Sequence, residues 1–313
     1  MANSKLADLT IGTRGSPLAL WQANWVKDQV EKEHQGIVVD LVPIQTKGDK
    51  ILDTPLAMVG GKGLFVKELE TALLDNSVDI AVHSMKDVPT MLPDGLVISV
   101  ICEREDPRDA FIASEVKAFS ELPKGARVGT SSLRRQAQIL SGRPDVEIIS
   151  IRGNVGTRLK KLESENLDAI ILAAAGMKRM EMEEVVTEYL EPSDCLPAVA
   201  QGAMGIETRI GDEKTASLIN FLNHNESALV VEAERAFLKR LEGGCQAPIA
   251  GYATLSGKEI ELTGLVGVTD GSVIYRDVVR GGVEQCTELG IRLAEELLKQ
   301  GGDEILREAY GEK

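Results

Sequence analysis

Short apolar runs alternate with longer amphipathic segments over the first hundred residues, which predicts strands and helices in turn. We expect strands at 9–13, 36–44 and 78–84 and helices at 17–33 and 64–75. The βαβαβ order favours a parallel, doubly wound sheet. Pro17 suits a first helical turn, and Ser16 before it is the expected N-cap.

The segment 46–63 interrupts this pattern. It holds four glycines and shows little periodicity. We predict a long mobile loop there.

The alternation resumes between about Asp109 and Ala200. The predicted elements, in chain order, are a strand at 126–130, a helix at 133–140, a strand at 146–151, a helix at 155–165 and a strand at 168–175. A further strand at 203–209 and a helix at 212–224 follow. The pattern indicates a second domain of the same kind, and two such domains usually leave a ligand-binding cleft at their strand ends.

The last ninety residues have a different pattern. Three strand-like runs follow one another between two helices, with helices at 227–241 and 287–299 and strands at 249–255, 260–268 and 273–279. Successive strands packed by helices predict a small α+β domain with an antiparallel sheet.

Composition narrows the class of protein. A chain of 313 residues exceeds one core, so two or three domains are expected, and 43% hydrophobic with 27% charged residues is typical of a globular protein. A net charge of -14 and only 4% aromatic residues argue against a nucleic-acid partner. The start of the chain lacks a signal pattern and the longest apolar run, 169–177, is too short for a membrane, so we expect a cytoplasmic protein.

Cysteine and histidine are sparse and scattered. No C-x-x-C pair occurs, and the histidines do not combine with the cysteines in a ligand spacing; the residues are Cys102, Cys195, Cys245, Cys286, His34, His83 and His224. The sequence therefore predicts neither a disulfide framework nor a metal site.

Arginine is concentrated between Arg127 and Arg158. This stretch holds six arginines, no lysine and two acids, in an otherwise acidic chain. A guanidinium can meet a carboxylate or a phosphate with two parallel hydrogen bonds, which favours an anion site. A solvated helix face with ion pairs is the alternative.

Three turns follow predicted strands, at 13–16, 83–89 and 128–135. The last, V-G-T-S-S-L-R-R, offers free backbone N–H groups, two hydroxyls and the positive end of a helix dipole, which suit phosphate and carboxylate equally. A plain N-cap at Ser131 or Ser132 is compatible with the same turn. The turn R-G-N-V-G-T-R, 152–158, adds a second pair of arginines.

Two single residues are candidates for chemistry. Asp87 lies just past a strand end, where a carboxylate could balance positive charge on a substrate, although an aspartate before V-P is more often a turn residue. Cys245 lies in L-E-G-G-C-Q-A-P after a helix end, where a thiol could serve as a nucleophile or attachment point, although a lone cysteine is more often inert.

Taken together, six motifs in this order resemble the porphobilinogen deaminase family over nearly the whole chain. They are T-R-G-S-P-L-A-L-W-Q (13–22), G-G-K-G-L-F-V-K-E-L-E (60–70), D-I-A-V-H-S-M-K-D-V-P (79–89), V-G-T-S-S-L-R-R-Q (128–136), R-G-N-V-G-T-R (152–158) and L-E-G-G-C-Q-A-P (241–248).

The resemblance implies an enzyme of tetrapyrrole biosynthesis. It would join four porphobilinogen molecules head to tail with loss of ammonia and release hydroxymethylbilane by hydrolysis, with a dipyrromethane cofactor bound by a thioether to Cys245. We expect a monomer whose product passes to uroporphyrinogen III synthase. A reversible two-lobed anion binder or sensor is the alternative, against which the missing export signal and missing DNA-binding helix both count.

The resemblance also assigns roles to residues. Asp87 would be catalytic; the cofactor would be bound by Lys86, Thr130, Ser131, Ser132, Arg134 and Arg135, and the substrate by Arg14, Ser16, Lys62, Phe65, Arg152, Arg158, Arg179 and Gln201. Phosphate then drops out as the preferred anion, because every pyrrole carries an acetate and a propionate. Arg127 and Arg143 match no motif position and are expected to be surface charges.

The same resemblance implies the fold class: α/β, with two doubly wound domains like a two-lobed periplasmic binding protein and a small α+β C-terminal domain. The chain would cross between the lobes near residues 100 and 200. The predicted domains are 1–102 with 202–221, then 103–201, then 222–313.

Overall fold

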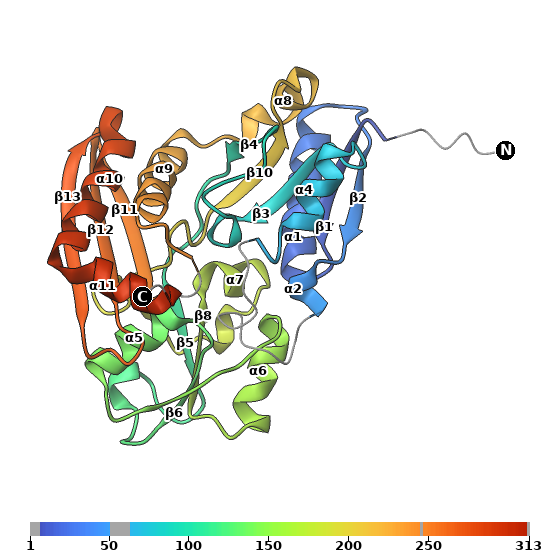
Figure 1. Ribbon diagram of the computed structural model, residues 1–313. Helices are drawn as coiled ribbons and strands as arrows, with labels where there is room; N and C mark the ends of the chain where they lie inside the picture. Colours follow the sequence, from blue (N-terminus) through green and yellow to red (C-terminus); the bar gives the residue numbers. More distant parts are fainter. Residues whose placement is uncertain (1–6, 51–62, 245–246, 312–313) are drawn as a thin grey trace. The chain divides into compact units, whose positions relative to one another are not determined.

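The computed structural model describes residues 7–50, 63–244 and 247–311, and these form two compact units. The first comprises the described residues of 1–52, 63–104 and 203–228, and the second those of 105–202 and 229–313. The described residues form three separate sheets (Figure 1), one within each of the three predicted domains, whose boundaries stay a prediction.

The first unit contains a five-stranded sheet of order β2-β1-β3-β10-β4. Its strands are β1 (Leu9–Arg14), β2 (Val39–Ile44), β3 (Ile80–Ser84), β4 (Leu96–Ile101) and β10 (Met204–Arg209). Its helices are α1 (Pro17–Glu33), α2 (Lys47–Lys50), α4 (Lys67–Leu74) and α8 (Glu213–Ile219), with short 3-10 turns at Met85–Asp87 (η1) and Asn220–Leu222 (η4).

Helix α1 begins as the sequence predicts. The Ser16 hydroxyl accepts a hydrogen bond from the Ala19 backbone N–H at 3.3 Å, and Pro17 occupies the first turn. The apolar side of the helix, including Val26 and Val30, is buried with Ile11 and Ile80 of the sheet. Burial of these side chains holds α1 against the sheet, and so fixes the start of α1 relative to the ends of β1 and β3.

The second unit contains a sheet of the same pattern, with order β7-β6-β8-β5-β9. Its strands are β5 (Asp109–Ala113), β6 (Arg127–Gly129), β7 (Glu147–Ile149), β8 (Ala169–Ala173) and β9 (Glu188–Leu190). The helices are α5 (Leu133–Gly142), α6 (Val155–Ser164) and α7 (Ala174–Arg179), with 3-10 turns at Phe119–Glu121 (η2) and Glu183–Val185 (η3).

The α/β class is confirmed, and the three predicted strands β1, β2 and β3 are parallel as expected, but each five-stranded sheet also contains an antiparallel strand. In each of the two five-stranded sheets four strands run in one direction and one runs the opposite way: β10 is antiparallel to its neighbours β3 and β4, and β5 is antiparallel to its neighbours β8 and β9. Strand β10 begins beside the end of β3, with the Met85 N–H donating to the Ala203 carbonyl at 3.0 Å. A strand that enters at that end has to run the opposite way. Strands β4, β5 and β9 were not predicted at all.

The remaining part of the second unit contains the antiparallel sheet and helices expected of the small α+β C-terminal domain. Strands β11 (Ile249–Ser256), β12 (Glu259–Gly267) and β13 (Ile274–Gly282) form an antiparallel sheet. Helix α9 (Asn225–Arg240), which enters the second unit after Ala228, and helix α10 (Cys286–Leu297) lie beside this sheet in Figure 1, and a π-helical stretch (Leu298–Gly302) leads to α11 (Asp303–Tyr310). A Cβ at Gly290 of α10 would lie 2.4 Å from the Ala233 carbonyl oxygen of α9, so this close helix contact requires glycine.

Within the described ranges, no helix is long and apolar enough to cross a membrane.

Candidate functional site

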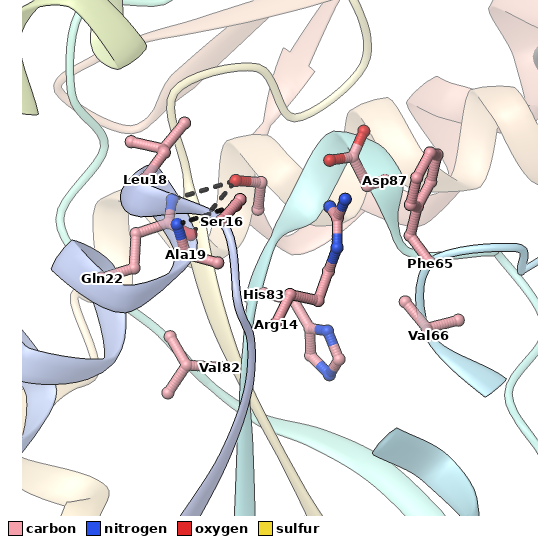
Figure 2. Close-up of a pocket in the computed structure, with 11 residues that line it drawn as sticks. Arg14, Ser16, Leu18, Ala19, Gln22, Phe65, Val66, Val82, His83 and Asp87 are labelled. Atoms are coloured by element: carbon pink, nitrogen blue, oxygen red, sulfur yellow. Dashed lines mark hydrogen bonds between the residues drawn. The ribbon is translucent and has the colours of Figure 1, made fainter. Parts of the chain in front are cut away.

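A pocket in the first unit lies at the carboxyl end of β1 and β3. These two strands are parallel, so the residues that follow them reach the same edge of the sheet. Figure 2 shows its lining, which comes from the end of β1, the start of α1, β3, the η1 turn and the segment before α4: Arg14, Ser16, Leu18, Ala19, Gln22, Phe65, Val66, Val82, His83, Ser84 and Asp87.

Predicted site residues gather in this pocket. Arg14, Ser16, Phe65 and Asp87 all line it. Asp87 ends the η1 turn and is exposed to solvent, and Figure 2 shows the Arg14 side chain extending toward it with the Phe65 ring beside them. The pocket therefore combines an exposed carboxylate with a guanidinium. Lys86, half-buried, precedes Asp87 on the same turn.

Arg14 is held by partners that the sequence did not reveal. Its Nε donates to both carboxylate oxygens of Asp49, at 3.2 and 3.3 Å, and its Cζ lies 4.2 Å from the centroid of the Phe65 ring. Burial raises the pKa of Asp49, but hydrogen bonds from Arg14 and Thr46 outweigh it, so the pKa lies below its ordinary value. Asp49 is thus the ionised partner of a proposed binding residue.

His83 and Glu207 form a buried pair beside the pocket. His83 Nε2 lies 2.9 Å from Glu207 Oε2, and their side chains are 3% and 0% exposed. Glu207 Oε1 is buried without a hydrogen-bond partner. Glu70 of α4 is also buried, and burial followed by the charge of Glu207 raises its pKa. Three ionisable groups therefore share one interior region, which scattered sequence positions could not disclose.

In the second unit, the turn before α5 presents Thr130, Ser131 and Ser132. The Ser132 hydroxyl caps the helix by accepting from the Arg135 N–H at 3.5 Å, and Thr130 Oγ1 accepts from the Ser132 N–H at 3.2 Å. Ser131 and Ser132 are half-buried, whereas Thr130 is buried. The N-cap interpretation is confirmed for Ser132.

Arg134 and Arg135 meet on a carboxylate of the protein itself. Arg134 Nη1 lies 2.8 Å from Asp109 Oδ2, and Arg135 Nη2 lies 2.7 Å from Asp109 Oδ1. Arg134 Nη1 also donates to the Leu196 carbonyl, and Arg135 Nη1 to that of Ile171, both at 2.8 Å. The Nε atoms of Arg134 and Arg135 are buried and have no hydrogen-bond partner among the residues that the structure describes.

Asp109 is the centre of this cluster. It accepts a further hydrogen bond from Gln201 Nε2 at 2.8 Å and one from the Cys195 thiol at 3.3 Å. Burial would raise the pKa of Asp109, yet the two guanidinium charges lower it well below its ordinary value. Asp109 was not predicted as a site residue; the available signal in the sequence was an acid that opens the apolar strand D-A-F-I-A.

The turn that opens α6 carries the second pair of arginines. Asn154 caps the helix by accepting from the Thr157 N–H at 2.9 Å, and Arg158 Nε donates to the Gly153 carbonyl at 2.8 Å. Gly153 has φ +118° and leaves only 2.6 Å for a Cβ beside Thr157, so glycine is required there. Arg152 and Arg158 are half-buried.

The remaining predicted residues lie in several places. Arg179 is buried and donates to the Gly202 carbonyl at 2.6 Å. Arg127 donates to the carbonyls of Glu165 and Asn166, and Arg143 pairs with Asp145 at 2.8 Å, both of them partly exposed as expected of surface charges. Cys245 and Lys62 lie outside the described residues, as does most of the predicted loop 46–63.

Comparison with known proteins gives matches over nearly the whole chain. Residues 9–217 match the family model described as porphobilinogen deaminase, dipyromethane cofactor binding domain, and residues 228–299 match porphobilinogen deaminase, C-terminal domain. The porphobilinogen deaminase of Geotalea uraniireducens is 58% identical over 305 residues, 97% of this chain and 96% of that protein. That of Geobacter metallireducens is 58% identical over 302 residues, 96% and 95% of the two chains.

A more distant likeness links the chain to solved structures. A nutrient-binding protein from Burkholderia cenocepacia bound to methionine has a TM-score of 0.42 and 13% identity, over 67% of this chain and 90% of that one.

Proposed function

The chain belongs to the porphobilinogen deaminase family, and from this premise we propose which residues carry its reaction. The enzyme polymerises four porphobilinogen molecules head to tail with loss of ammonia and releases hydroxymethylbilane for tetrapyrrole synthesis. The alternative of a binder without catalysis is set aside by this membership. The observation that carries the assignment is the pocket that combines Asp87 with Arg14.

Asp87 is proposed as the catalytic residue. The substrate passes through a state in which positive charge develops on a pyrrole nitrogen as ammonia leaves. An exposed carboxylate at the pocket stabilises that charge and assists proton transfer. Lys86 on the same turn is proposed to bind a carboxylate of the cofactor.

Arg14 and Ser16 are proposed to bind substrate carboxylates in this pocket, with Phe65 at the side of the guanidinium and Lys62 as a further contact. The acetate and propionate of porphobilinogen are planar anions that a guanidinium meets with two hydrogen bonds. Arg14 Nη1 has no hydrogen bond to another described residue, which supports this role.

The family's cofactor is a dipyrromethane, which when bound supplies the primer to which substrate units are added. We propose Cys245 as its thioether attachment residue. The donor set of the second unit fits its carboxylates. Ser131 and Ser132 are half-buried at the start of the ten-residue helix α5, and the buried Nε atoms of Arg134 and Arg135 lack partners.

Thr130, Arg134 and Arg135 are proposed to complete this cofactor site, with Arg152, Arg158, Arg179 and Gln201 binding the lengthening chain. Arg134 and Arg135 already pair with Asp109. Their proposed contribution is therefore a fixed positive charge close to the turn of Thr130, Ser131 and Ser132. Arg152 and Arg158, half-buried on the adjacent turn, remain the more accessible charges.

The protein is further proposed to act as a cytoplasmic monomer whose product is consumed by uroporphyrinogen III synthase. Chemistry supports the consuming step, because a linear tetrapyrrole released by hydrolysis has to be closed into a ring by a separate reaction.

Intact-protein mass spectrometry tests this function. The holoenzyme should exceed the mass of the unmodified chain by the cofactor, and porphobilinogen should add increments of one deaminated pyrrole. Cys245→Ser should abolish the adduct. Asp87→Ala should keep it but lose turnover by about a hundredfold or more.

Asp94→Ala, which removes another exposed acid of the same unit, is the control and should keep full turnover. Substantial turnover in Asp87→Ala would remove that residue from its role.

A further inference from the structure

The short helix α2 supplies a carboxylate to the arginine of the proposed substrate pocket. Asp49 accepts hydrogen bonds from Arg14 Nε at 3.2 and 3.3 Å and a shorter one from Nη2. Both side chains are 22% exposed, so the pair is neither sealed in the interior nor fully solvated. One edge of the Arg14 guanidinium is therefore occupied by the protein, while Nη1 has no hydrogen bond to another described residue.

Asp49 is itself held in place by Thr46, which is fully buried. Thr46 Oγ1 donates to Asp49 Oδ2 at 2.8 Å, and the Thr46 backbone N–H donates to the same oxygen at 3.3 Å. The two carboxylate oxygens of Asp49 thus differ in their partners. Oδ2 accepts the hydrogen bonds of Thr46, and Oδ1 accepts the Nη2 hydrogen bond of Arg14. A carboxylate held on one side orients the group on its other side.

Phe65 fixes the face of the same guanidinium. Its ring centroid lies 4.2 Å from Arg14 Cζ, a cation–π distance. The ring packs against Gly48, where a Cβ would lie 2.3 Å from the ring carbon Cε1, and the Gly48 N–H donates to the Leu64 carbonyl at 2.9 Å. Residues 46–49 therefore hold Arg14 from its edge and, through Phe65, from its face.

We propose that Asp49 is a positioning residue for the polymerisation, and this inference rests on the proposed role of Arg14. Asp49 occupies the Nε–Nη2 edge so that Arg14 is held rigidly with Nη1 available to a carboxylate of porphobilinogen. An arginine on a flexible stem loses rotamer freedom when it binds, and a partner that fixes it beforehand reduces that loss. Substrate affinity, rather than the chemical step, should depend on Asp49.

The test uses the holoenzyme, with KM and kcat measured for porphobilinogen. Asp49→Asn should raise KM about tenfold, the worth of one charge-assisted hydrogen bond, with kcat changed much less. Thr46→Val should also raise KM, because it removes the hydroxyl that holds Asp49. Thr46→Ser keeps the hydroxyl and should leave KM close to the wild-type value. Asp40→Asn, an exposed acid of β2, is the matched control and should leave KM unchanged.

A double variant separates positioning from a general structural role. If Asp49 acts through Arg14, Asp49→Asn should raise KM only slightly when it is added to the Arg14→Lys variant. A full tenfold effect in that background would overturn the inference. So would an unchanged KM in Asp49→Asn, or a lowered one, which would make Asp49 a competitor of the substrate.

Counting pyrrole units on the protein by mass separates this inference from the proposed function. Asp49→Asn should need more porphobilinogen than the wild type to capture the same number of units. A wild-type protein that captures none would overturn the proposed function and the inference with it. A wild type that captures units at the same concentrations as Asp49→Asn would overturn the inference alone.

Discussion

Arg134 and Asp109 form a buried, two-pronged ion pair in the second unit. Nη1 donates to Oδ2 at 2.8 Å and Nη2 to Oδ1 at 3.2 Å, and the side chains are 6% and 0% exposed. Arg135 adds a second guanidinium on Asp109 Oδ1. One carboxylate thus balances two buried cations, and the cluster retains positive charge beside the serine turn that opens α5.

Asp109→Asn should strongly destabilise the protein. The variant leaves two buried guanidinium groups without a counter-charge, and breaking a buried pair from one side typically costs about 3–5 kcal/mol of unfolding free energy. Urea denaturation at pH 7 measures this cost.

The partly exposed pair between Arg143 and Asp145 offers a matched control at a similar distance, 2.8 Å. Asp145→Asn should destabilise the protein much less than Asp109→Asn, because solvent screens that pair. Equal losses in the two variants would show that burial does not set the strength of the Asp109 cluster.

Acid should not break the Asp109 cluster under mild conditions. Arginine lowers the folded-state pKa of Asp109 far below its ordinary value, so its stabilisation is present above the unfolded pKa of about 3.9 and is lost only as the pH falls through the lower folded value. The difference in unfolding free energy between wild type and Asp109→Asn should therefore stay constant from pH 8 to about pH 5. A difference that halves over this range would contradict the lowered pKa.

The arginine cluster illustrates what sequence could and could not predict. Six arginines within 32 residues are visible in the printed chain, and motif order relates them to a family of carboxylate-binding enzymes. The sequence could not predict that Asp109 pairs with Arg134 and Arg135. Asp109 lies on β5, and this pairing depends on β5 lying antiparallel beside β8. Contacts between strands distant in sequence depend on the sheet order.

The fold shows the same division. Period and caps placed α1 at 17–33 correctly, since Ser16 and Pro17 are local signals. The direction of β10 has no local signal, because any apolar strand pattern reads alike in both directions. Asp49 was likewise assigned to a loop although it lies in α2, since a four-residue helix leaves no periodic pattern.

Glu70→Gln should stabilise the protein increasingly as the pH rises. Burial and the nearby Glu207 raise the folded-state pKa of Glu70, so the folded protein binds this proton more tightly than the unfolded chain. The contribution of Glu70 to the free energy of unfolding is therefore fully present below the unfolded pKa of about 4.3 and is lost as the pH rises through the folded-state pKa. Glutamine removes that loss.

Urea denaturation at pH 5 and pH 8 checks this expectation, with Glu163→Gln on the exposed face of α6 as control. The control should shift the unfolding free energy by less than about 0.5 kcal/mol at both values. A Glu70→Gln gain that shrinks toward pH 8 would reverse the expected sign.

The reactivity of the thiols should identify the cofactor-bearing cysteine. Cys102, Cys195 and Cys286 are buried, and burial together with Asp109 raises the pKa of Cys195 to about 12, so little thiolate is available there. Brief maleimide treatment at pH 7.5, followed by mass spectrometry, should add one label to the folded apoenzyme and none to the holoenzyme, because the thioether consumes the thiol of Cys245. Apo Cys245→Ser should take up none, and urea should expose three thiols in the holoenzyme and four in the wild-type apoenzyme. Rapid labelling of the folded holoenzyme would show that Cys245 does not carry the cofactor or that a buried thiol is accessible, and peptide mapping distinguishes the two.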